Sequence, residues 1–233
     1  AQYRNLYTHF LEFYRVNVLD LSISESRIDN LKSLITPSAE ADTFRTLDYG
    51  FTVEDFNNSF SLEPFDVFPA DYGIKQFINE RTTSISSMLN YQTAQPNIYA
   101  IDWYPKNPLP NDTIHVYSSV FSNDGLNQVQ VQYSINNSAI EYSSMNFEPV
   151  ADTKIVEESD LWHGIIPPIG EGGTVSFKIL ANGTNLLSQL SPRNEHIILS
   201  TPQAITDTLF VNELMALNSS TILDDNGDYD DWI

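Results

Sequence analysis

The sequence predicts a multidomain α + β protein with an N-terminal helical region, an antiparallel β-sandwich of immunoglobulin or fibronectin III type, and a short C-terminal β segment. Two observations lead to this prediction. Apolar residues recur at helical spacing as far as Met88, and from Pro96 onward they alternate with polar residues at a period of two. Between them the stretch QTAQP keeps neither period, which marks a domain boundary. We therefore divide the chain into residues 1–92, 96–201 and 205–233.

The helical region begins with an amphipathic helix. Its apolar face is formed by Tyr3, Leu6, Tyr7, Phe10, Leu11, Tyr14 and Val18. Ser22 and Glu25 have the spacing of a capping box, in which each side chain satisfies an unpaired amide of the first turn, so a second helix is predicted there. Pro37 is expected to end that helix and to open a third one over residues 37–47, because a proline fits best at the first helical position.

Two further features of the helical region are predicted from its middle part. Thr52 and Asp55 repeat the capping-box spacing ahead of Phe56, which predicts another helix start. The loop that follows contains two prolines and also Phe65 and Phe68. We expect both aromatic side chains to fill the helical core rather than to bind a ligand.

The last helix before the boundary has one charged residue on its apolar face. That face contains Ile74, Phe77, Ile78, Ile85 and Met88, and Arg81 falls among them. An unpaired buried charge is costly, so a carboxylate is expected within salt-bridge distance. The candidates are Asp29, Asp42, Asp48 and Asp55. The alternative is that Arg81 lays its stem on the apolar face and extends its charged head into water.

The β domain is predicted from alternating strands separated by turn residues. Strand patterns occupy residues 114–120, 129–135, 161–166, 175–180 and 196–199, and Asn123-Asp124-Gly125 has the composition of a turn. Short strands at this spacing, with no helical pattern between them, favour an antiparallel sandwich. Trp103 and Trp162 are expected in its core or at its ends.

The composition excludes some classes of partner. The formal charge is −20, from 31 acidic and 11 basic residues, which argues against nucleic acid and anionic membranes, because both attract clustered Lys and Arg. No run approaches the ~20 apolar residues of a membrane span. There is no cysteine, so disulfides and thiolate metal sites are excluded. A cationic or metal-bearing partner is compatible with this charge.

The densest polar cluster lies near the C-terminal end and is a weak candidate for calcium binding. Its oxygen ligands would be Asp224, Asp225, Asn226, Asp228 and Asp230. The EF-hand order requires an acidic residue five positions before the glycine, and Ile222 stands there instead. The favoured interpretation is an Asn-Gly hairpin turn with solvated carboxylates.

No catalytic residue is predicted. The four histidines, His9, His115, His163 and His196, share no metal-ligand spacing, and no zinc or acid–base role is expected of them. No G-x-S-x-G sequence marks a hydrolase nucleophile.

Three segments resemble parts of CotH-kinase-family secreted proteins, named for a spore coat protein. The helical region, with YRNLYTHFLEFY, RIDNLKSLITPSAEAD and GIKQFINERTTSISSML, is similar to the C-terminal helices of the CotH domain. The stretch beginning PNIYAIDWYPKNPLPNDTIHVYSSVFSNDG resembles the immunoglobulin-like modules that follow such domains. Residues 211–233, VNELMALNSSTILDDNGDYDDWI, resemble the opening of a lamin-tail domain.

The resemblance implies an exported protein whose parent has a protein-kinase-like fold that binds ATP and Mg²⁺. The nucleotide-binding and metal-binding residues of that family have no counterpart here, since no Gly-rich loop with a following Lys is present. We therefore expect no cofactor in this chain and a non-catalytic scaffold and interaction role at the cell surface, with surface proteins or glycans as partners. The alternative is a free-standing extracellular adhesion or carbohydrate-binding fragment.

Overall fold

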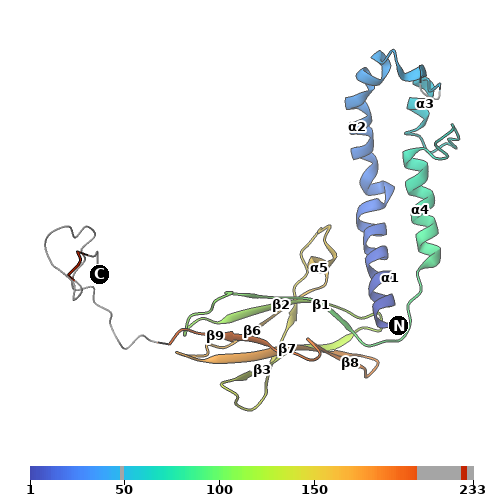
Figure 1. The fold of residues 1–233 in the computed structure, drawn as a ribbon. Coiled ribbons are helices and arrows are strands. Elements are labelled where there is room, and N and C mark those ends of the chain that lie inside the picture. The colour runs from blue at the N-terminus through green and yellow to red at the C-terminus, as the bar shows by residue number, and fades with distance from the viewer. Residues whose placement is uncertain (48–49, 204–226, 230–233) are drawn as a thin grey trace.

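The protein consists of a helical arm, formed by residues 2–88, and a β-sandwich, joined by residues 89–96 (Figure 1). The computed structural model describes residues 1–47, 50–203 and 227–229. The predicted helical region and the predicted antiparallel sheets are both present. The predicted C-terminal segment, residues 205–233, lies outside the described residues except for 227–229.

The arm is a pair of antiparallel helical stretches that rises from the sandwich. One stretch is α1 (Gln2–Tyr14), the π-helical η1 (Arg15–Leu19) and α2 (Leu21–Ala41); the other is α4 (Ile74–Met88), and η2 (Arg45–Leu47) and α3 (Val53–Asn58) lie at the tip. In Figure 1 α4 runs back along α2 and α1 toward the sandwich. The chain therefore enters and leaves the arm at the same end.

Two predicted helix boundaries are wrong and one is confirmed. Asp20, not Ser22, caps α2, because its Oδ1 accepts the Ser22 amide hydrogen at 2.9 Å. Pro37 lies inside α2, where a proline removes only the bond to the carbonyl four residues earlier and the helix continues to Ala41. The Thr52–Asp55 capping box is present, with both side chains bonded to each other's backbone amides.

The β domain contains two antiparallel sheets. One has the strand order β1 (Asn97–Tyr104), β2 (Ile114–Phe121), β6 (Leu161–Ile166), β5 (Asn146–Phe147). The other has the order β4 (Glu141–Ser144), β3 (Leu126–Ile135), β7 (Thr174–Gly183), β8 (Ser188–Ser191), and β9 (Ile197–Ser200) also pairs with β7. A single helical turn, α5 (Val156–Ser159), precedes β6.

One hydrophobic core holds the two sheets together. It is formed by Ile114, Val116, Val120, Val129, Val131, Tyr133, Met145, Ile166, Ile169, Val175, Phe177, Ile179, Ala181 and Leu199. The predicted alternation on β3 is confirmed, with Val129 and Val131 buried. Trp103 and Trp162 pack against this core, also as expected. Gly125 has a φ of 88° in the predicted turn, a conformation that glycine adopts without strain.

Candidate functional sites

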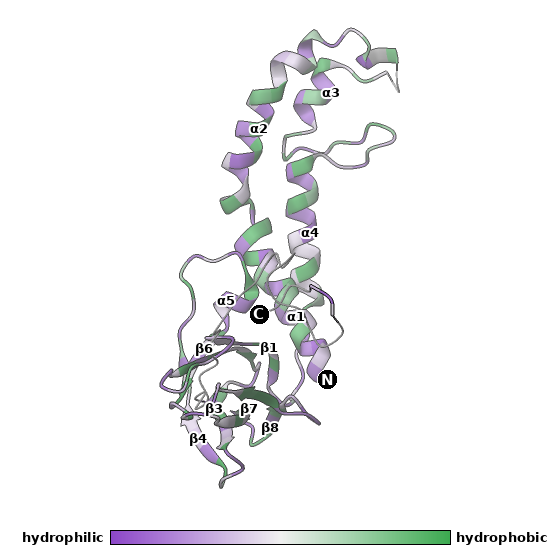
Figure 2. Cartoon of the chain, turned by 60° about the vertical axis from the view of Figure 1, so that its left-hand side comes forward, coloured by the Kyte–Doolittle hydropathy of each residue, from purple (hydrophilic) through white to green (hydrophobic). Residues whose placement is uncertain are grey.

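The helical arm leaves most of its large apolar side chains exposed to solvent. Figure 2 shows hydrophobic residues, in green, along the whole length of the arm. Within the described part of residues 1–88, the buried apolar side chains are Phe13, Phe65 and Ile85, and α2 buries none of its residues. The exposed set comprises Tyr3, Tyr7, Tyr14, Val16, Val18, Ile23, Leu31, Leu34, Ile35, Phe44, Leu47, Leu62, Phe68, Tyr72, Ile74, Phe77 and Met88. We call this set the arm surface. Soluble proteins seldom expose so many large apolar side chains on one element without a partner.

The predicted inner faces of the arm helices are only partly covered. On α1, Tyr3 is 78% exposed, whereas the buried side chains are Asn5, Thr8 and Phe13. On α4, Phe77 is 54% exposed and Lys75 is buried, whereas Ile85 is buried as predicted. The reason is geometric: two helices in a pair cover only a narrow stripe of each other, and that stripe includes only part of each apolar face. The other part of each face remains open.

Lys75 joins α4 to α2. Its ammonium Nζ lies 2.8 Å from Asp29 Oδ1 and 2.9 Å from Glu25 Oε1. The hydrogen bonds to Asp29 and Glu25 raise the pKa of Lys75 above its usual value, against the cost of burial. Asp29 and Glu25 are about half exposed, so the pair lies at the edge of the helix interface.

The ion pair expected for Arg81 is not present among the described residues. Arg81 is exposed, and it borders a shallow pocket with Tyr72, Phe77 and Ser84. Asp29, one of its four predicted partners, binds Lys75 instead, and Asp48 lies outside the described residues. The correct alternative is the exposed arginine, because α4 turns this face away from α2.

The tip of the arm has an apolar pocket of about 290 Å³, lined by Arg45, Phe51, Thr52, Asp55, Phe56, Ser59, Phe65 and Ala70. Phe65 is buried beneath it, as predicted. Phe68 is exposed, so the expectation that it fills the core is wrong. The pocket and the exposed aromatic side chain belong to the same open region of the arm.

The arm is attached to the sandwich through polar contacts of α1. Asn5 donates to the Gln92 carbonyl at 2.6 Å and accepts the Gln92 amide hydrogen at 3.0 Å, which fixes α1 against the connecting segment. Gln2 donates to the Pro96 carbonyl at 2.7 Å, and Tyr91 donates to Glu12 Oε2 at 2.6 Å. Asn5 is buried, yet both polar groups of its amide are satisfied.

A charged cluster on the sandwich side completes this junction. Asp160 Oδ2 accepts a hydrogen bond from Tyr99 at 2.6 Å and lies 2.6 Å from His9 Nε2. The His9 ring stacks on Phe121 with a centroid distance of 3.7 Å. Burial and the nearby charge of Asp160 raise the pKa of Tyr99, and burial and the hydrogen bond to Glu12 raise the pKa of Tyr91. The three groups therefore join α1, β1 and the end of α5.

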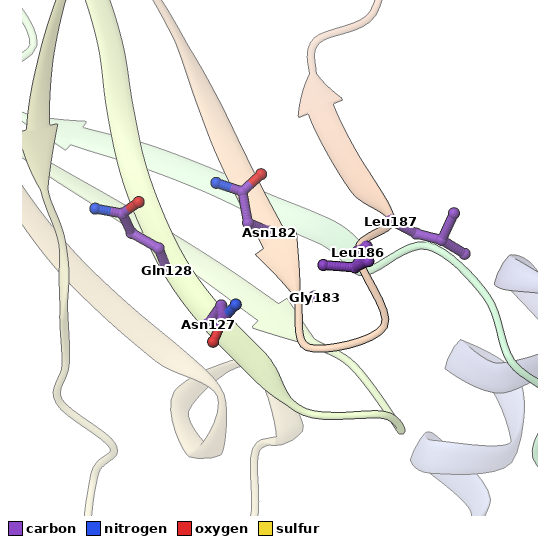
Figure 3. Close-up of a pocket in the computed structure, with 6 residues that line it drawn as sticks. All are labelled: Asn127, Gln128, Asn182, Gly183, Leu186 and Leu187. Atoms are coloured by element: carbon purple, nitrogen blue, oxygen red, sulfur yellow. The ribbon is translucent and has the colours of Figure 1, made fainter.

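The sandwich has a pocket at the end of the β3–β7 pair (Figure 3), with a volume of about 430 Å³. Its lining is Asn127, Gln128, Asn182, Gly183, Leu186 and Leu187. Gln128 and Asn182 are cross-strand partners. Leu186 has a φ of 66°, a backbone conformation that is unusual for a leucine. Residues with such strained backbone conformations are found most often at functional sites, including loops that contact ligands. No residue of this pocket was predicted, because amides on exposed strand positions give no sequence signal.

The structure brings together two histidines that the sequence analysis treated as unrelated. His115 on β2 and His163 on β6 lie side by side, with Nδ1 of His115 2.9 Å from Nε2 of His163. The two residues are 48 positions apart in the sequence, so no short spacing links them. The register of β2 against β6 brings them together. His9 is in the junction, and His196 precedes β9.

The predicted calcium cluster is described only at residues 227–229. Gly227 has a φ of 87°, a conformation that suits an Asn-Gly turn, and Asp228 is exposed. Asp224, Asp225, Asn226 and Asp230 lie outside the described residues. Where side chains are described, no group of three or more His, Asp or Glu is arranged to hold a metal ion.

No family model matches the chain, and no curated protein matches it. Among solved structures, an uncharacterized Listeria monocytogenes protein in complex with glucose, magnesium and calcium is 12% identical with a TM-score of 0.34, covering 48% of this chain and 9% of that one. A cycloalternan-degrading enzyme of Trueperella pyogenes is 12% identical with a TM-score of 0.33, covering 42% and 15%.

A cycloalternan-forming enzyme of Listeria monocytogenes is 14% identical with a TM-score of 0.34, covering 58% of this chain and 12% of that one. The chain therefore spans only a small part of each of these proteins. In the segments that the structure describes, none of the helices is both long enough and apolar enough to cross a bilayer.

Proposed function

We propose that this chain is a non-catalytic scaffold and interaction part of an exported CotH-like multidomain protein, in which the helical arm packs against the remainder of a kinase-like domain. The observation that supports this most strongly is the arm surface, whose apolar faces are open along α1, α2 and α4. Burying one side chain of the size of Leu, Ile or Phe contributes about 1.5 to 3 kcal/mol. A partner that covered four or five of them would bind tightly enough to form a permanent domain interface.

The strand order supports an immunoglobulin-like assignment for the sandwich. The sheets β1-β2-β6-β5 and β4-β3-β7-β8 have the order of the A-B-E-D and C′-C-F-G strands of that fold. β8 and β9 both pair with β7, at separate halves of that strand, so together they take the place of one interrupted G strand. In this proposal the sandwich is the module that follows the kinase-like domain and carries contacts to surface proteins or glycans.

The test is hydrogen exchange on two polypeptides, this chain alone and a longer chain that includes the nucleotide-binding half that the proposal requires. Amides of α1, α2 and α4 should gain protection in the longer chain, whereas those of β2, β3 and β7 should not change. Leu34→Glu and Phe77→Glu should remove the gain, because a charge on the arm surface opposes burial. Thr83→Glu, at an exposed polar position of α4, is the matched control. Equal protection in both polypeptides would contradict the proposal.

A second function, glycan binding by the sandwich, is favoured by the pocket of Figure 3. The amides of Gln128 and Asn182 each have donors and acceptors that fit vicinal hydroxyl groups, and Leu186 offers an apolar surface for sugar C–H groups. Calorimetric titration with hexose oligosaccharides checks this. Binding should be lost in Asn182→Ala and kept in Gln132→Ala, which removes an amide from the same strand face outside the pocket.

A further inference from the structure

His115 and His163 lie on the outer face of the β1-β2-β6-β5 sheet. His163 pairs directly with Tyr117 in the register of β2 and β6, and His115 pairs with Ile165. The two imidazoles are therefore diagonal neighbours on one face, close enough for their rings to meet. Because the strands hold them at this spacing, their approach is built into the backbone and does not depend on a flexible loop.

The two ring edges face each other. The rings are inclined by 14° and their centroids are 5.1 Å apart, while the facing nitrogens are 2.9 Å apart. The distance between the ring centres matches the distance between the two nitrogens plus the distance from each ring centre to its own nitrogen. The two nitrogens therefore lie close to the line that joins the ring centres. The lone pair of one imidazole therefore points at the nitrogen of the other, and no side chain lies between them.

Glu148 determines which nitrogen of His163 carries the hydrogen. Its Oε2 lies 3.3 Å from His163 Nδ1, on the far side of the ring from His115. A carboxylate at this position accepts the Nδ1 hydrogen and leaves the Nε2 lone pair directed at His115. Histidines that bind metals are oriented in the same way, because a carboxylate accepts the hydrogen of the ring nitrogen that does not bind the metal.

Tyr117 supports the same ring from one side. Its ring is inclined by 15° to that of His163, with centroids 4.8 Å apart. The His163 side chain remains 20% exposed, and its Nε2 is hydrogen-bonded to His115. The pair is therefore sheltered and oriented, but still open to solvent.

We propose that Nδ1 of His115 and Nε2 of His163 form a two-nitrogen site for a divalent late transition-metal ion, with Glu148 as the second-sphere brace. Two nitrogens bound cis to one ion at about 2.05 Å are about 2.9 Å apart in square-planar geometry and about 3.3 Å apart in tetrahedral geometry. The observed separation of 2.9 Å, at which one ring is hydrogen-bonded to the other, is close to the first value. Cu²⁺ prefers that geometry and imidazole ligands, and water completes its shell.

Binding requires small changes in the two side chains. Both rings must turn about χ2, which is a broad torsion in histidine, so that the lone pairs converge on one ion, and the hydrogen bond between the rings is lost. His115 must also carry its hydrogen on Nε2 instead of Nδ1, a tautomer shift that leaves the total number of protons unchanged. The formal charge of −20 favours approach of a cation. The described residues contain no group of three or more carboxylates and imidazoles that could hold a metal ion. The proposed site has only two protein ligands.

The test is titration of the chain with CuCl₂, NiCl₂ and ZnCl₂ by calorimetry, together with electron paramagnetic resonance of the Cu²⁺ complex. One equivalent of Cu²⁺ should bind more tightly than Ni²⁺ or Zn²⁺, and the spectrum should show two equatorial nitrogens. His115→Asn and His163→Asn should each weaken Cu²⁺ at least tenfold, and Glu148→Gln about tenfold. His196→Asn is the matched control and should leave the affinity unchanged. Thermal unfolding followed by circular dichroism establishes that each variant is folded before its metal affinity is compared.

The proposal fails if the folded His115→Asn and His163→Asn variants bind Cu²⁺ as tightly as the original chain. It also fails if the spectrum contains one nitrogen or none, because surface carboxylates alone would then account for binding. Equal losses in His196→Asn would likewise overturn it. None of these outcomes depends on the scaffold role proposed above, since the metal site lies on the sandwich and the arm surface is not involved.

Discussion

Two cations on one helix show how the environment of a residue decides its role. Lys75 and Arg81 both lie on α4, but Lys75 is buried against α2 with two carboxylates, and Arg81 is exposed beside Phe77. Six positions along a helix rotate a side chain far enough to exchange the inner face for the outer one. The charge that joins the helices is therefore the lysine, which the apolar pattern did not identify.

Replacing these two residues should affect stability unequally. Arg81→Ala and Arg81→Met should each lower the free energy of unfolding by less than ~1 kcal/mol, because an exposed cation without an ion pair contributes little. Lys75→Met should cost about 1 to 3 kcal/mol, because it removes two charge-assisted hydrogen bonds while keeping most of the stem. Denaturant titration measures both. A larger loss in Arg81→Ala than in Lys75→Met would contradict the assignment.

The junction tyrosines should make the attachment of the arm sensitive to alkali. The pKa values of Tyr91 and Tyr99 are raised above 10.0 in the folded chain, so their contribution to stability is complete below that pH. As the pH rises above 10, the unfolded chain loses protons that the folded chain keeps, and the free energy of unfolding falls. The raised pKa of Lys75 acts in the same direction.

Tyrosinate absorbance and far-ultraviolet circular dichroism, followed together during an alkaline titration, measure this effect. Burial and a hydrogen bond to Glu141 also raise the pKa of Tyr133 in the sandwich. Three tyrosines should therefore ionise late and together with loss of structure, and two should ionise late in Tyr99→Phe. Tyr3→Phe, which changes an exposed ring, is the control. Ionisation of every tyrosine near pH 10, before any loss of structure, would be the opposite result.

At the scale of elements, the two parts of the chain differ in how they bury apolar groups. Every member of the sandwich core lies between Ile114 and Leu199, and none comes from the arm. Hydrogen bonds of Gln2, Asn5 and Glu12 hold the arm to the connecting segment. The His9–Asp160 pair and the ring contacts of His9 with Phe121 and of Phe10 with Tyr99 hold it to the sandwich. Polar contacts of this kind can be replaced by water when the two parts separate.

Limited proteolysis should therefore cut the chain within residues 91–96 and release a sandwich fragment of about residues 96–201 that still unfolds cooperatively. Asn5→Ala should speed this cleavage, because it removes both hydrogen bonds to Gln92. Asn79→Ala, an exposed position on α4, should not change it. Mass spectrometry identifies the fragment, and a broad or absent thermal transition of that fragment would show that the arm completes its core.

At the scale of the whole molecule, the scaffold role that we propose is based on the open arm surface, which contrasts with the closed sandwich core. The kinase-like activity proposed for a parent protein needs a phosphate-binding loop, a lysine and metal-binding carboxylates in one cleft. The sequence contains no Gly-rich loop followed by a lysine. Three pockets in the described residues are lined by amides, apolar groups or isolated charges instead. A further pocket, between β2 and α5, contains the carboxylates of Asp102, Glu157 and Glu158 but no lysine.

This chain alone should bind ATP·Mg²⁺ no tighter than millimolar. The reason is that the groups which hold triphosphate and Mg²⁺ in kinases have no counterpart in its sequence. Isothermal titration calorimetry with ATP and MgCl₂ checks this, and ATP without metal is the control for binding to surface cations. A dissociation constant in the micromolar range would show that the chain contains a nucleotide site.

The sequence was sufficient for features that depend on neighbouring residues. The change of period at residues 92–96, the alternating burial of β3, the turn at Gly125 and the Thr52–Asp55 capping box all follow from local spacing or backbone conformation. Each requires only that a side chain lies near its own backbone or that one face of a strand is buried. For the same reason, the cap at Asp20 was open to prediction and was assigned two residues too late.

The features that remained hidden depend on which surfaces meet. An apolar stripe shows that a helix has an apolar face, but the partner helix decides how much of that face is covered, and in α1 and α4 only part of it is. His115 and His163 were unrelated in sequence because only the register of β2 on β6 places them 2.9 Å apart. The sequence by itself was enough for the change from helices to antiparallel strands, for several of the individual elements and for the strong negative charge. The tertiary structure decided what those elements bury and what they leave open, because packing between distant segments has no local signal.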